Sequence, residues 1–213
     1  IHRIHPTHGI IGEEFGNHNA DAEFVWVLDP IDGTKSFMTG KPLFGTLIGL
    51  CRDGVPLVGI IDQPVLEERW VGIVHHGTTL NGQVVQTGDV VHDLSDAMMY
   101  TTDPQMFREG YELERFTSIR DAVKSPVYGG DCYSYACVAS GYADLVIEAD
   151  LGVYDYAAIV PVIQGAGGYI SNWEGGDLHL DKHDTECHGR VVAAANHQLW
   201  TSAIDLLSSD TDG

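Results

Sequence analysis

An apolar run that ends abruptly in an acidic turn constrains this chain more than any other feature of its sequence. The run spans Phe24–Leu28 and predicts a short buried strand. Pro30 fixes its own φ angle and favours an extended backbone at Asp29, while Gly33 permits a tight turn. Asp29 and Asp32 therefore follow the strand on a rigid turn, from which two carboxylates can converge on one hard cation.

Backbone groups of the same turn could complete such a site. The Ile31 carbonyl lies between the two acids and is a candidate third oxygen ligand. The N–H groups of Gly33 and Thr34 are well placed to meet a phosphate. Aspartate, proline and glycine are also common turn residues, so a solvated acidic turn is the alternative interpretation.

Composition limits the classes of function. Hydrophobic residues make up 44% of the 213 residues, so the chain can bury a core and disorder is not expected. The formal net charge of −20 argues against nucleic acid or an anionic membrane as a partner. No stretch approaches the roughly 20 apolar residues that span a bilayer. The four cysteines form no zinc-binding spacing.

Strand and helix signals divide the chain into two parts. Residues 1–95 predict an N-terminal lobe with the acidic turn and an antiparallel sheet. Residues 96–213 alternate strands with helices and predict a C-terminal α/β lobe with a mixed sheet. We expect the lobes to form one compact unit. The expected strands are 9–12, 24–28, 44–51, 55–62, 69–75, 98–101, 123–128, 145–148, 169–171 and 191–194, and the expected helices are 104–120, 133–140, 154–165 and 197–207.

Two further motifs make the acidic turn specific. Gly12-Glu13-Glu14 precedes the turn, and Tyr154-Asp155-Tyr156-Ala157-Ala158 lies far downstream. Together with the turn they resemble the inositol monophosphatase family of magnesium-dependent phosphatases, over nearly the whole chain. Segments 35–46 and 128–133 are similar to the histidinol-phosphate phosphatase branch of that family.

The resemblance implies a layered fold, the α/β/α/β/α sandwich. Family members usually carry several dozen residues, including two helices, before the position of Ile1. We therefore expect the first helical layer to be largely missing from this chain, and the chain to be a fragment or a processed product.

The resemblance also implies a set of metal ligands. Hard oxygen donors suit Mg²⁺ rather than Zn²⁺, and several acids near one point repel each other without cations, so we expect two or three Mg²⁺ ions. Taken alone, Glu13 could be a solvated loop acid and Asp155 an acid favoured at a helix N-terminus. The implied ligands are the side chains of Glu13, Asp29, Asp32 and Asp155 and the carbonyl of Ile31.

Catalytic roles follow from the same resemblance. Glu13 and Asp32 would act at the metal, with Glu13 reaching the attacking water, and Thr34 would orient that water. Gly33 and Thr34 would bind the phosphate. In relatives the threonine pairs with an acid of the N-terminal segment, which this sequence does not hold. A non-catalytic metal-binding fragment is therefore an alternative of another class.

Asp131 and Glu148 are the candidate substrate-binding residues. Glu148 precedes Asp155 by seven residues, the family spacing for a contact to the organic part of the substrate, and Asp131 falls where relatives meet the same part. Two carboxylates beyond the phosphate site suit the imidazole and amine of histidinol phosphate. Asp131 could also cap the helix expected at 133–140.

These features favour a Mg²⁺-dependent histidinol-phosphate phosphatase of histidine biosynthesis. An inositol monophosphatase or a broad sugar-phosphate phosphatase is the alternative within the same class. We expect a small phosphorylated substrate, a homodimer, and a cytoplasmic location or, if a transit peptide has been removed, a plastid. One further cluster could hold a soft metal but is expected to be a surface loop: Asp181, His183, Glu186, Cys187 and His188.

Overall fold

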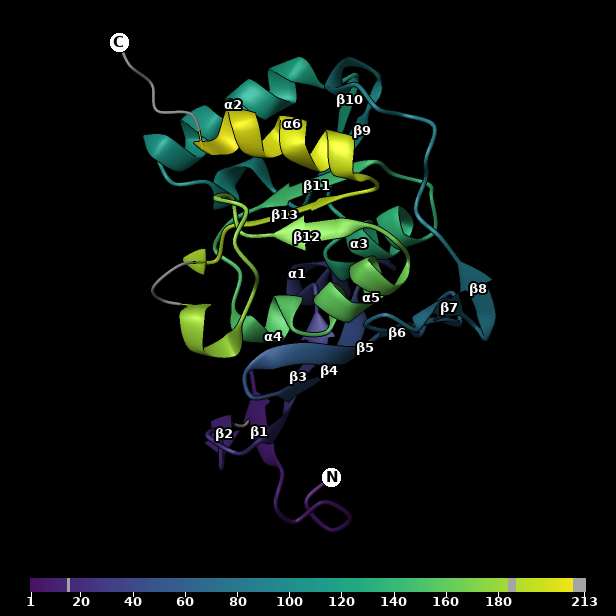
Figure 1. Cartoon of the computed structure of the whole chain (residues 1–213), viewed down its shortest axis with the longest axis vertical. Helices are drawn as coiled ribbons and strands as arrows, with labels where there is room; N and C mark the ends of the chain where they lie inside the picture. The colour runs from purple at the N-terminus through teal and green to yellow at the C-terminus, as the bar shows by residue number, and fades with distance from the viewer. Residues whose placement is uncertain (15, 184–186, 209–213) are drawn as a thin grey trace.

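Two stacked β-sheets with helices between and above them make up the fold (Figure 1). The computed structural model describes residues 1–14, 16–183 and 187–208. Sheet A contains β1 (Gly9–Gly12), β2 (Gly16–His18), β3 (Phe24–Asp32), β4 (Gly45–Arg52), β5 (Val55–Gln63), β6 (Glu68–Ile73), β7 (Gly77–Leu80) and β8 (Gln83–Val85). Sheet B contains β9 (Met98–Thr101), β10 (Ser125–Tyr128), β11 (Leu145–Glu148), β12 (Tyr169–Ser171) and β13 (Val191–Ala194). The helices are α1 (Thr34–Met38), α2 (Tyr111–Ala122), α3 (Cys132–Ala139), α4 (Val153–Tyr156), α5 (Ile159–Gly165) and α6 (His197–Ser208), with 3₁₀ turns η1 (Leu94–Asp96), η2 (Pro104–Met106) and η3 (Leu180–Lys182).

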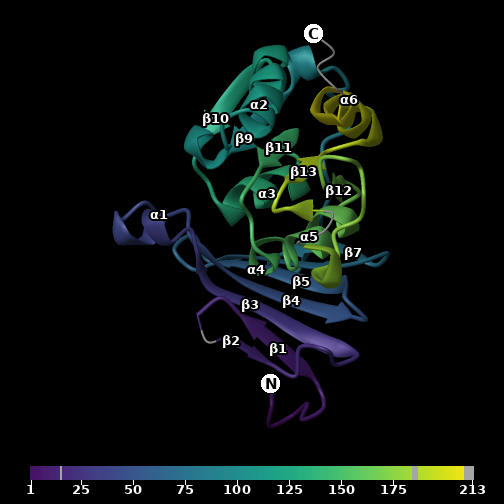
Figure 2. The same cartoon turned by 90° about the vertical axis from the view of Figure 1, so that its left-hand side faces the viewer.

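The layers follow the order that the sequence predicts for the α/β/α/β/α sandwich. Helices α3, α4 and α5 lie between the two sheets, and α2 and α6 cover the far face of sheet B (Figure 2). Within the described residues, no helix covers the outer face of sheet A (Figure 2). The described residues therefore contribute no first helical layer. The predicted division at residue 95 falls between the two sheets, in the segment from β8 to β9.

Alternation along the strands of sheet A explains which face is buried. Val25 and Val27 of β3 point inward and are almost fully buried, as are Leu47 of β4 and Ile61 of β5. Their neighbours in sequence, such as Trp26, point to the uncovered face and are half-buried. This is the two-residue period of a pleated strand.

Sheet A corrects one prediction, because it is not antiparallel throughout. Its order is β2-β1-β3-β4-β5-β6-β7-β8, and β1 runs parallel to β3. The reason is β2, which carries no strand signal but pairs antiparallel with β1. The chain reverses once more after β2, so β3 runs in the direction of β1 on its other side.

Two predicted helices are divided in the structure. The helix expected at 104–120 is instead η2 followed by α2, because Gly110 has a φ of 88° and interrupts the helical conformation. The helix expected at 154–165 becomes α4 and α5, which meet at residues 157–158. Helix α1, directly after Gly33, was not predicted from the sequence.

A row of three glycines on sheet A lets α4 and α5 lie directly on the strands. Gly49, Gly59 and Gly72 are register partners on β4, β5 and β6. A β-carbon at Gly49 would lie 3.0 Å from the Ala157 carbonyl carbon, and one at Gly59 would overlap the Ala158 carbonyl. Since α4 carries Asp155, this close approach determines how near that acid comes to β3.

Replacing Gly59 with alanine should therefore loosen the contact between α4–α5 and the sheet. We expect Gly59→Ala to lower the free energy of unfolding by roughly 3 kcal/mol, since overpacking against backbone cannot relax easily. Urea denaturation measures the change. Gly88→Ala is the matched control, because the nearest atom to its added β-carbon would be 3.8 Å away. Equal stability of the two variants would contradict the packing argument.

Candidate metal and substrate site

Three carboxylates converge at the end of β3. Asp29 and Asp32 come from β3 and Asp155 from α4, and one oxygen of each lies within 4.8 Å of the others. In a regular strand, residues three apart point to opposite faces. The pairing of β3 with β4 shifts register between Asp29 and Asp32, and this bulge lets both acids face the same side.

Backbone amides anchor each of the three carboxylates. Asp29 Oδ1 accepts from the Ile31 N–H at 2.9 Å. Asp32 Oδ2 accepts from the Cys132 N–H, and Asp155 Oδ2 from the Gly152 N–H, both at 2.6 Å. Each acid thus has one oxygen fixed and a second oxygen that can face the shared centre.

The other predicted ligands lie around this cluster. Glu13 is exposed, and its side chain is within hydrogen-bond reach of Asp29. The Ile31 carbonyl accepts from the Thr34 hydroxyl at 3.1 Å. Gly33 precedes α1 with a φ of 81°, the left-handed conformation that the tight turn needs. The structure therefore brings the predicted ligands and the turn that is predicted to bind phosphate into one region.

Burial and mutual repulsion disfavour ionisation of the cluster. Burial, with the nearby charges of Asp32 and Glu13, raises the pKa of Asp29 to about 8. Burial and Asp32 raise the pKa of Asp155 to about 8, and the Gly152 hydrogen bond opposes the rise. Burial raises the pKa of Asp32 to about 6, opposed by hydrogen bonds from Cys132. A hard divalent cation would relieve the repulsion, and an all-oxygen donor set suits one. The cluster could therefore bind a metal ion.

The second cluster considered in the sequence has a different structure. Glu186 lies outside the described residues. Cys187 is buried, and its thiol lies 3.5 Å from the Arg190 carbonyl. Among residues 1–14, 16–183 and 187–208, Asp29, Asp32 and Asp155 form the one group of acidic, histidine or cysteine side chains that converges in this way.

A small acidic cavity adjoins the carboxylate cluster. Its volume is about 150 Å³. Asp32 and Asp155 form the side shared with the cluster, and Asp131 and Glu148 also line it. Thus both predicted substrate-binding residues reach the space beside the candidate metal ligands. The remaining lining residues are Thr102, Met106, Cys132, Tyr135, Leu151 and Ile159.

Asp131 corrects a prediction, because its side chain does not cap α3. It occupies the position before the helix with φ 48° and ψ −138° and makes no side-chain capping bond. This backbone conformation is strained for a residue other than glycine. Its carboxylate turns toward the acidic turn instead, where Oδ2 accepts from the Ser36 hydroxyl at 2.8 Å. A β-carbon at Gly33 would lie 2.8 Å from the same oxygen, so a glycine is required there.

Glu148 is buried within the cavity wall. Its side chain accepts from the Thr102 N–H at 3.0 Å and from the Tyr135 hydroxyl at 2.9 Å. Burial raises the pKa of Glu148 to about 7, although both hydrogen bonds oppose the rise. Sequence reasoning missed Thr102 and Tyr135, because neither belongs to a motif. The one available signal was the polar hydroxyl of Tyr135 within the largely apolar helix expected at 133–140, since a buried hydroxyl needs a hydrogen-bond partner.

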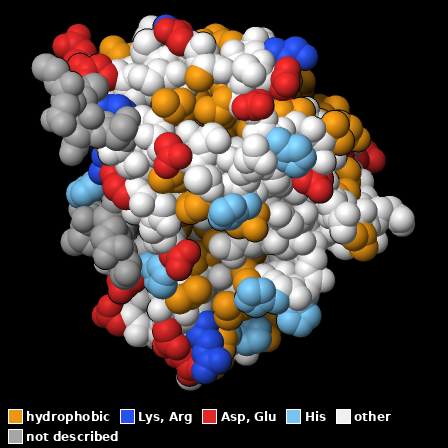
Figure 3. All heavy atoms as spheres, turned by 45° about the horizontal axis from the view of Figure 1, so that its top comes forward, with side chains coloured by type: hydrophobic (Ala, Val, Ile, Leu, Met, Phe, Trp, Pro, Cys, Tyr) orange, Lys and Arg blue, Asp and Glu red, His pale blue; other side chains and the backbone are white. Residues whose placement is uncertain are grey.

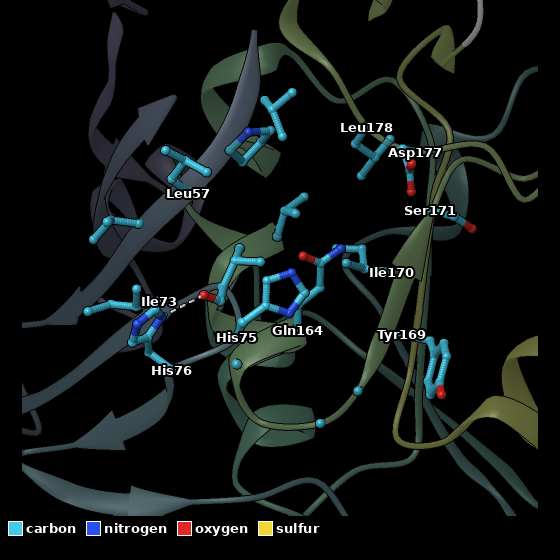
Figure 4. Close-up of a pocket in the computed structure, with 18 of the residues that line it drawn as sticks. Leu57, Ile73, His75, His76, Gln164, Tyr169, Ile170, Ser171, Asp177 and Leu178 are labelled. Atoms are coloured by element: carbon cyan, nitrogen blue, oxygen red, sulfur yellow. Dashed lines mark hydrogen bonds between the residues drawn. The ribbon is translucent and has the colours of Figure 1, made fainter. Parts of the chain in front are cut away.

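A cavity larger than the acidic one lies elsewhere in the described part of the chain. It measures about 1160 Å³ and lies between β5, the β6–β7 turn, α5 and β12, with His75 and Gln164 projecting into it (Figure 4). None of the described residues that line it belongs to the predicted site. Histidine and hydrophobic side chains are prominent on the face of the molecule shown in Figure 3. Cavity size alone would therefore have selected a different region.

Comparisons with known proteins identify the family of the chain. The model of the inositol monophosphatase family matches residues 1–209. The bifunctional phosphatase IMPL2, chloroplastic, of Arabidopsis thaliana is 54% identical over 206 residues, which are 95% of this chain and 59% of that protein. A histidinol-phosphatase from Mycobacterium tuberculosis is 34% identical over 178 residues, which are 81% of this chain and 68% of that protein.

Solved structures show the same fold. An inositol monophosphatase from Zymomonas mobilis superposes with a TM-score of 0.88 at 40% identity, over 98% of this chain and 78% of that one. The chain spans 59% of the length of the Arabidopsis relative, and the motifs quoted above lie within the matched region. Sequence and fold together show that the chain belongs to the inositol monophosphatase family.

Proposed function

We propose that this chain is a Mg²⁺-dependent phosphate monoester hydrolase that acts on histidinol phosphate and releases L-histidinol. The observation that carries the proposal is the acidic cavity beside the carboxylate cluster. None of the described residues that line it is lysine, arginine or histidine. Such a cavity suits a substrate with a cationic organic part, and histidinol phosphate carries an imidazole and a primary amine.

The metal ligands of this proposal are the side chains of Asp29, Asp32, Asp155 and Glu13 with the Ile31 carbonyl. Mg²⁺ bound there, as two or three ions, would polarise the phosphate, activate a water and neutralise the leaving alkoxide. The anchoring amides hold the carboxylates in place before an ion arrives, which favours a defined coordination geometry.

The acidic turn would position the water and the phosphate. The Thr34 hydroxyl donates to Ile31, and a hydroxyl in that orientation can still accept from a water and fix its direction. The N–H groups of Gly33 and Thr34 lie at the start of α1 and would donate hydrogen bonds to the phosphate oxygens. Asp131 and Glu148, which also line the cavity, would meet the organic part of the substrate.

The names of the relatives support a phosphatase activity and are compatible with two candidate substrates. The Mycobacterium relative is named a histidinol-phosphatase. The Zymomonas structure is of an inositol monophosphatase, and the hydroxyls of inositol could also donate to Asp131 and Glu148. Inositol monophosphate is therefore the second candidate substrate.

Partner and compartment follow as part of the proposal. We propose a homodimer that does not bind nucleic acid, in line with the net charge of −20. Each helix in the described part of the chain is too short or too polar to cross a membrane. The chloroplast in the name of the Arabidopsis relative favours a plastid over the cytoplasm.

Steady-state kinetics with three substrates tests the assignment. We expect kcat/KM for histidinol phosphate to exceed the values for inositol monophosphate and fructose 1,6-bisphosphate by about tenfold or more, because it alone carries cationic groups into the acidic cavity. Phosphate release by the full-length natural protein is the measurement. A higher kcat/KM for either of the other substrates would contradict the assignment.

Asp32→Asn tests the metal ligands. The variant keeps an acceptor for the Cys132 N–H but loses a charge of the cluster. We expect kcat to fall about a hundredfold or more, and the rise in Tm on adding Mg²⁺ to disappear. Asp53→Asn in an exposed turn is the control and should keep both properties. A Tm shift of wild-type size in Asp32→Asn would exclude Asp32 as a ligand.

The cluster also predicts the pH dependence of stability without metal. The pKa values of Asp29 and Asp155 are about 8 in the folded chain, against an ordinary 3.8. A carboxyl group whose pKa is raised on folding makes its full contribution to stability at pH values below its ordinary pKa. That contribution is lost as the pH rises through the pKa of the folded state. In EDTA the urea midpoint should therefore fall between about pH 4 and about pH 8, and saturating Mg²⁺ should suppress the fall. An unchanged slope in Asp155→Asn would show that other groups cause it.

A further inference from the structure

Glu148 differs from the three candidate metal ligands in how its oxygens are held. Each of Asp29, Asp32 and Asp155 has one oxygen on a backbone amide. Glu148 has both oxygens engaged, Oε1 by the Thr102 N–H and Oε2 by the Tyr135 hydroxyl. A carboxylate has about four lone-pair sites, so two remain for a ligand in the cavity. The two donors fix the direction in which those sites point.

Tyr135 is placed to serve this carboxylate. Its side chain is 1% exposed, and it extends from α3 into the wall of the acidic cavity. A buried tyrosine hydroxyl needs a partner, and here the partner is Glu148. Burial and the charge of Glu148 raise the pKa of Tyr135 well above its usual value, so the group remains a donor.

Thr102 joins Glu148 to the second substrate-facing acid. Its N–H donates to Glu148, and its hydroxyl accepts from the Asp131 N–H at 3.2 Å. Asp131 in turn accepts from Ser36. One continuous network, from α3 through β11 and the end of β9 to α1, therefore holds both acids beside the cavity.

We propose that Tyr135 is a positioning residue that fixes the Glu148 carboxylate to receive the cationic part of the substrate, with Thr102 tying Glu148 to Asp131. The inference rests on the proposed function and deepens it. A glutamate free to rotate would be drawn to cations held by the neighbouring cluster. Because both of its oxygens accept hydrogen bonds, the Glu148 carboxylate keeps facing the cavity. The acids proposed to hold metal are thereby distinct from the acid proposed to select the organic part of the substrate.

Tyr135→Phe tests the role, because it removes the hydroxyl and keeps the ring. We expect KM for histidinol phosphate to rise about tenfold, the usual effect of losing one hydrogen bond to a charged group, with kcat within about twofold. KM for inositol monophosphate, which brings no charge to Glu148, should rise about threefold or less. Glu148→Gln should reproduce the pattern, and the double variant should be no worse than Glu148→Gln alone.

Tyr133→Phe is the matched control. Tyr133 lies on the same helix, and its hydroxyl also donates to a glutamate, Glu68, at 2.9 Å. Glu68 lies on β6, and neither residue lines the acidic cavity. This variant should therefore keep the wild-type KM for both substrates. A rise in KM equal to that of Tyr135→Phe would mean that loosening α3 explains both effects, and would overturn the proposal.

Binding of L-histidinol, measured by titration calorimetry in Mg²⁺, gives a readout that does not depend on turnover. A loss of about tenfold in affinity for L-histidinol in Tyr135→Phe would support the positioning role. Poor hydrolysis of histidinol phosphate by the wild type would count against the proposed function but not against this role. Equal affinity in wild type and Tyr135→Phe, or no binding by the wild type, would overturn the inference. If Tyr135→Phe does not fold, an unchanged affinity in Glu148→Gln would overturn it instead.

Discussion

The close contact between the α4–α5 segment and the glycine row of sheet A is the constraint on which the site depends. Asp155 lies in α4, while Asp29 and Asp32 belong to the sheet beneath it. With side chains at Gly49 or Gly59, the helical layer would stand further from the strands and carry Asp155 away. Hard divalent cations bind oxygen ligands at short, narrowly defined distances, so a packing distance in the core determines whether the three acids could share one ion.

The same constraint creates an electrostatic conflict that the backbone resolves only in part. Packing brings three acids together out of water, and their pKa values rise because burial and repulsion disfavour the charged forms. The amides of Ile31, Cys132 and Gly152 oppose this effect and fix the orientation of the carboxylates. These amides come from three separate parts of the chain, so the fold itself determines the geometry of the cluster. Full ionisation of the three acids would require a bound cation.

Local signals made part of this arrangement predictable from sequence. The strand, the proline and the glycine around Asp29 and Asp32 act within ten residues and predict the strand itself, but β3 continues through Asp32 instead of ending at Leu28, so both acids lie on the strand and not on the turn after it. Asp155 could be assigned only by resemblance, because its approach depends on glycines on other strands. The capping role expected for Asp131 was wrong because its strained backbone directs the carboxylate to Ser36. Thr102 and Tyr135 act on Glu148 from 46 and 13 residues away, and no spacing rule reports such contacts.

The arrangement separates the candidate chemistry from the candidate selectivity. The proposed metal ligands lie on β3, on α4 and just after β1, whereas the acids proposed to face the organic part of the substrate lie on β11 and just before α3. Glu148 is held by Thr102 and Tyr135, whereas Asp29, Asp32 and Asp155 are held by the amides of Ile31, Cys132 and Gly152. We therefore expect a change of substrate preference to require changes around Asp131 and Glu148 rather than in the carboxylate cluster.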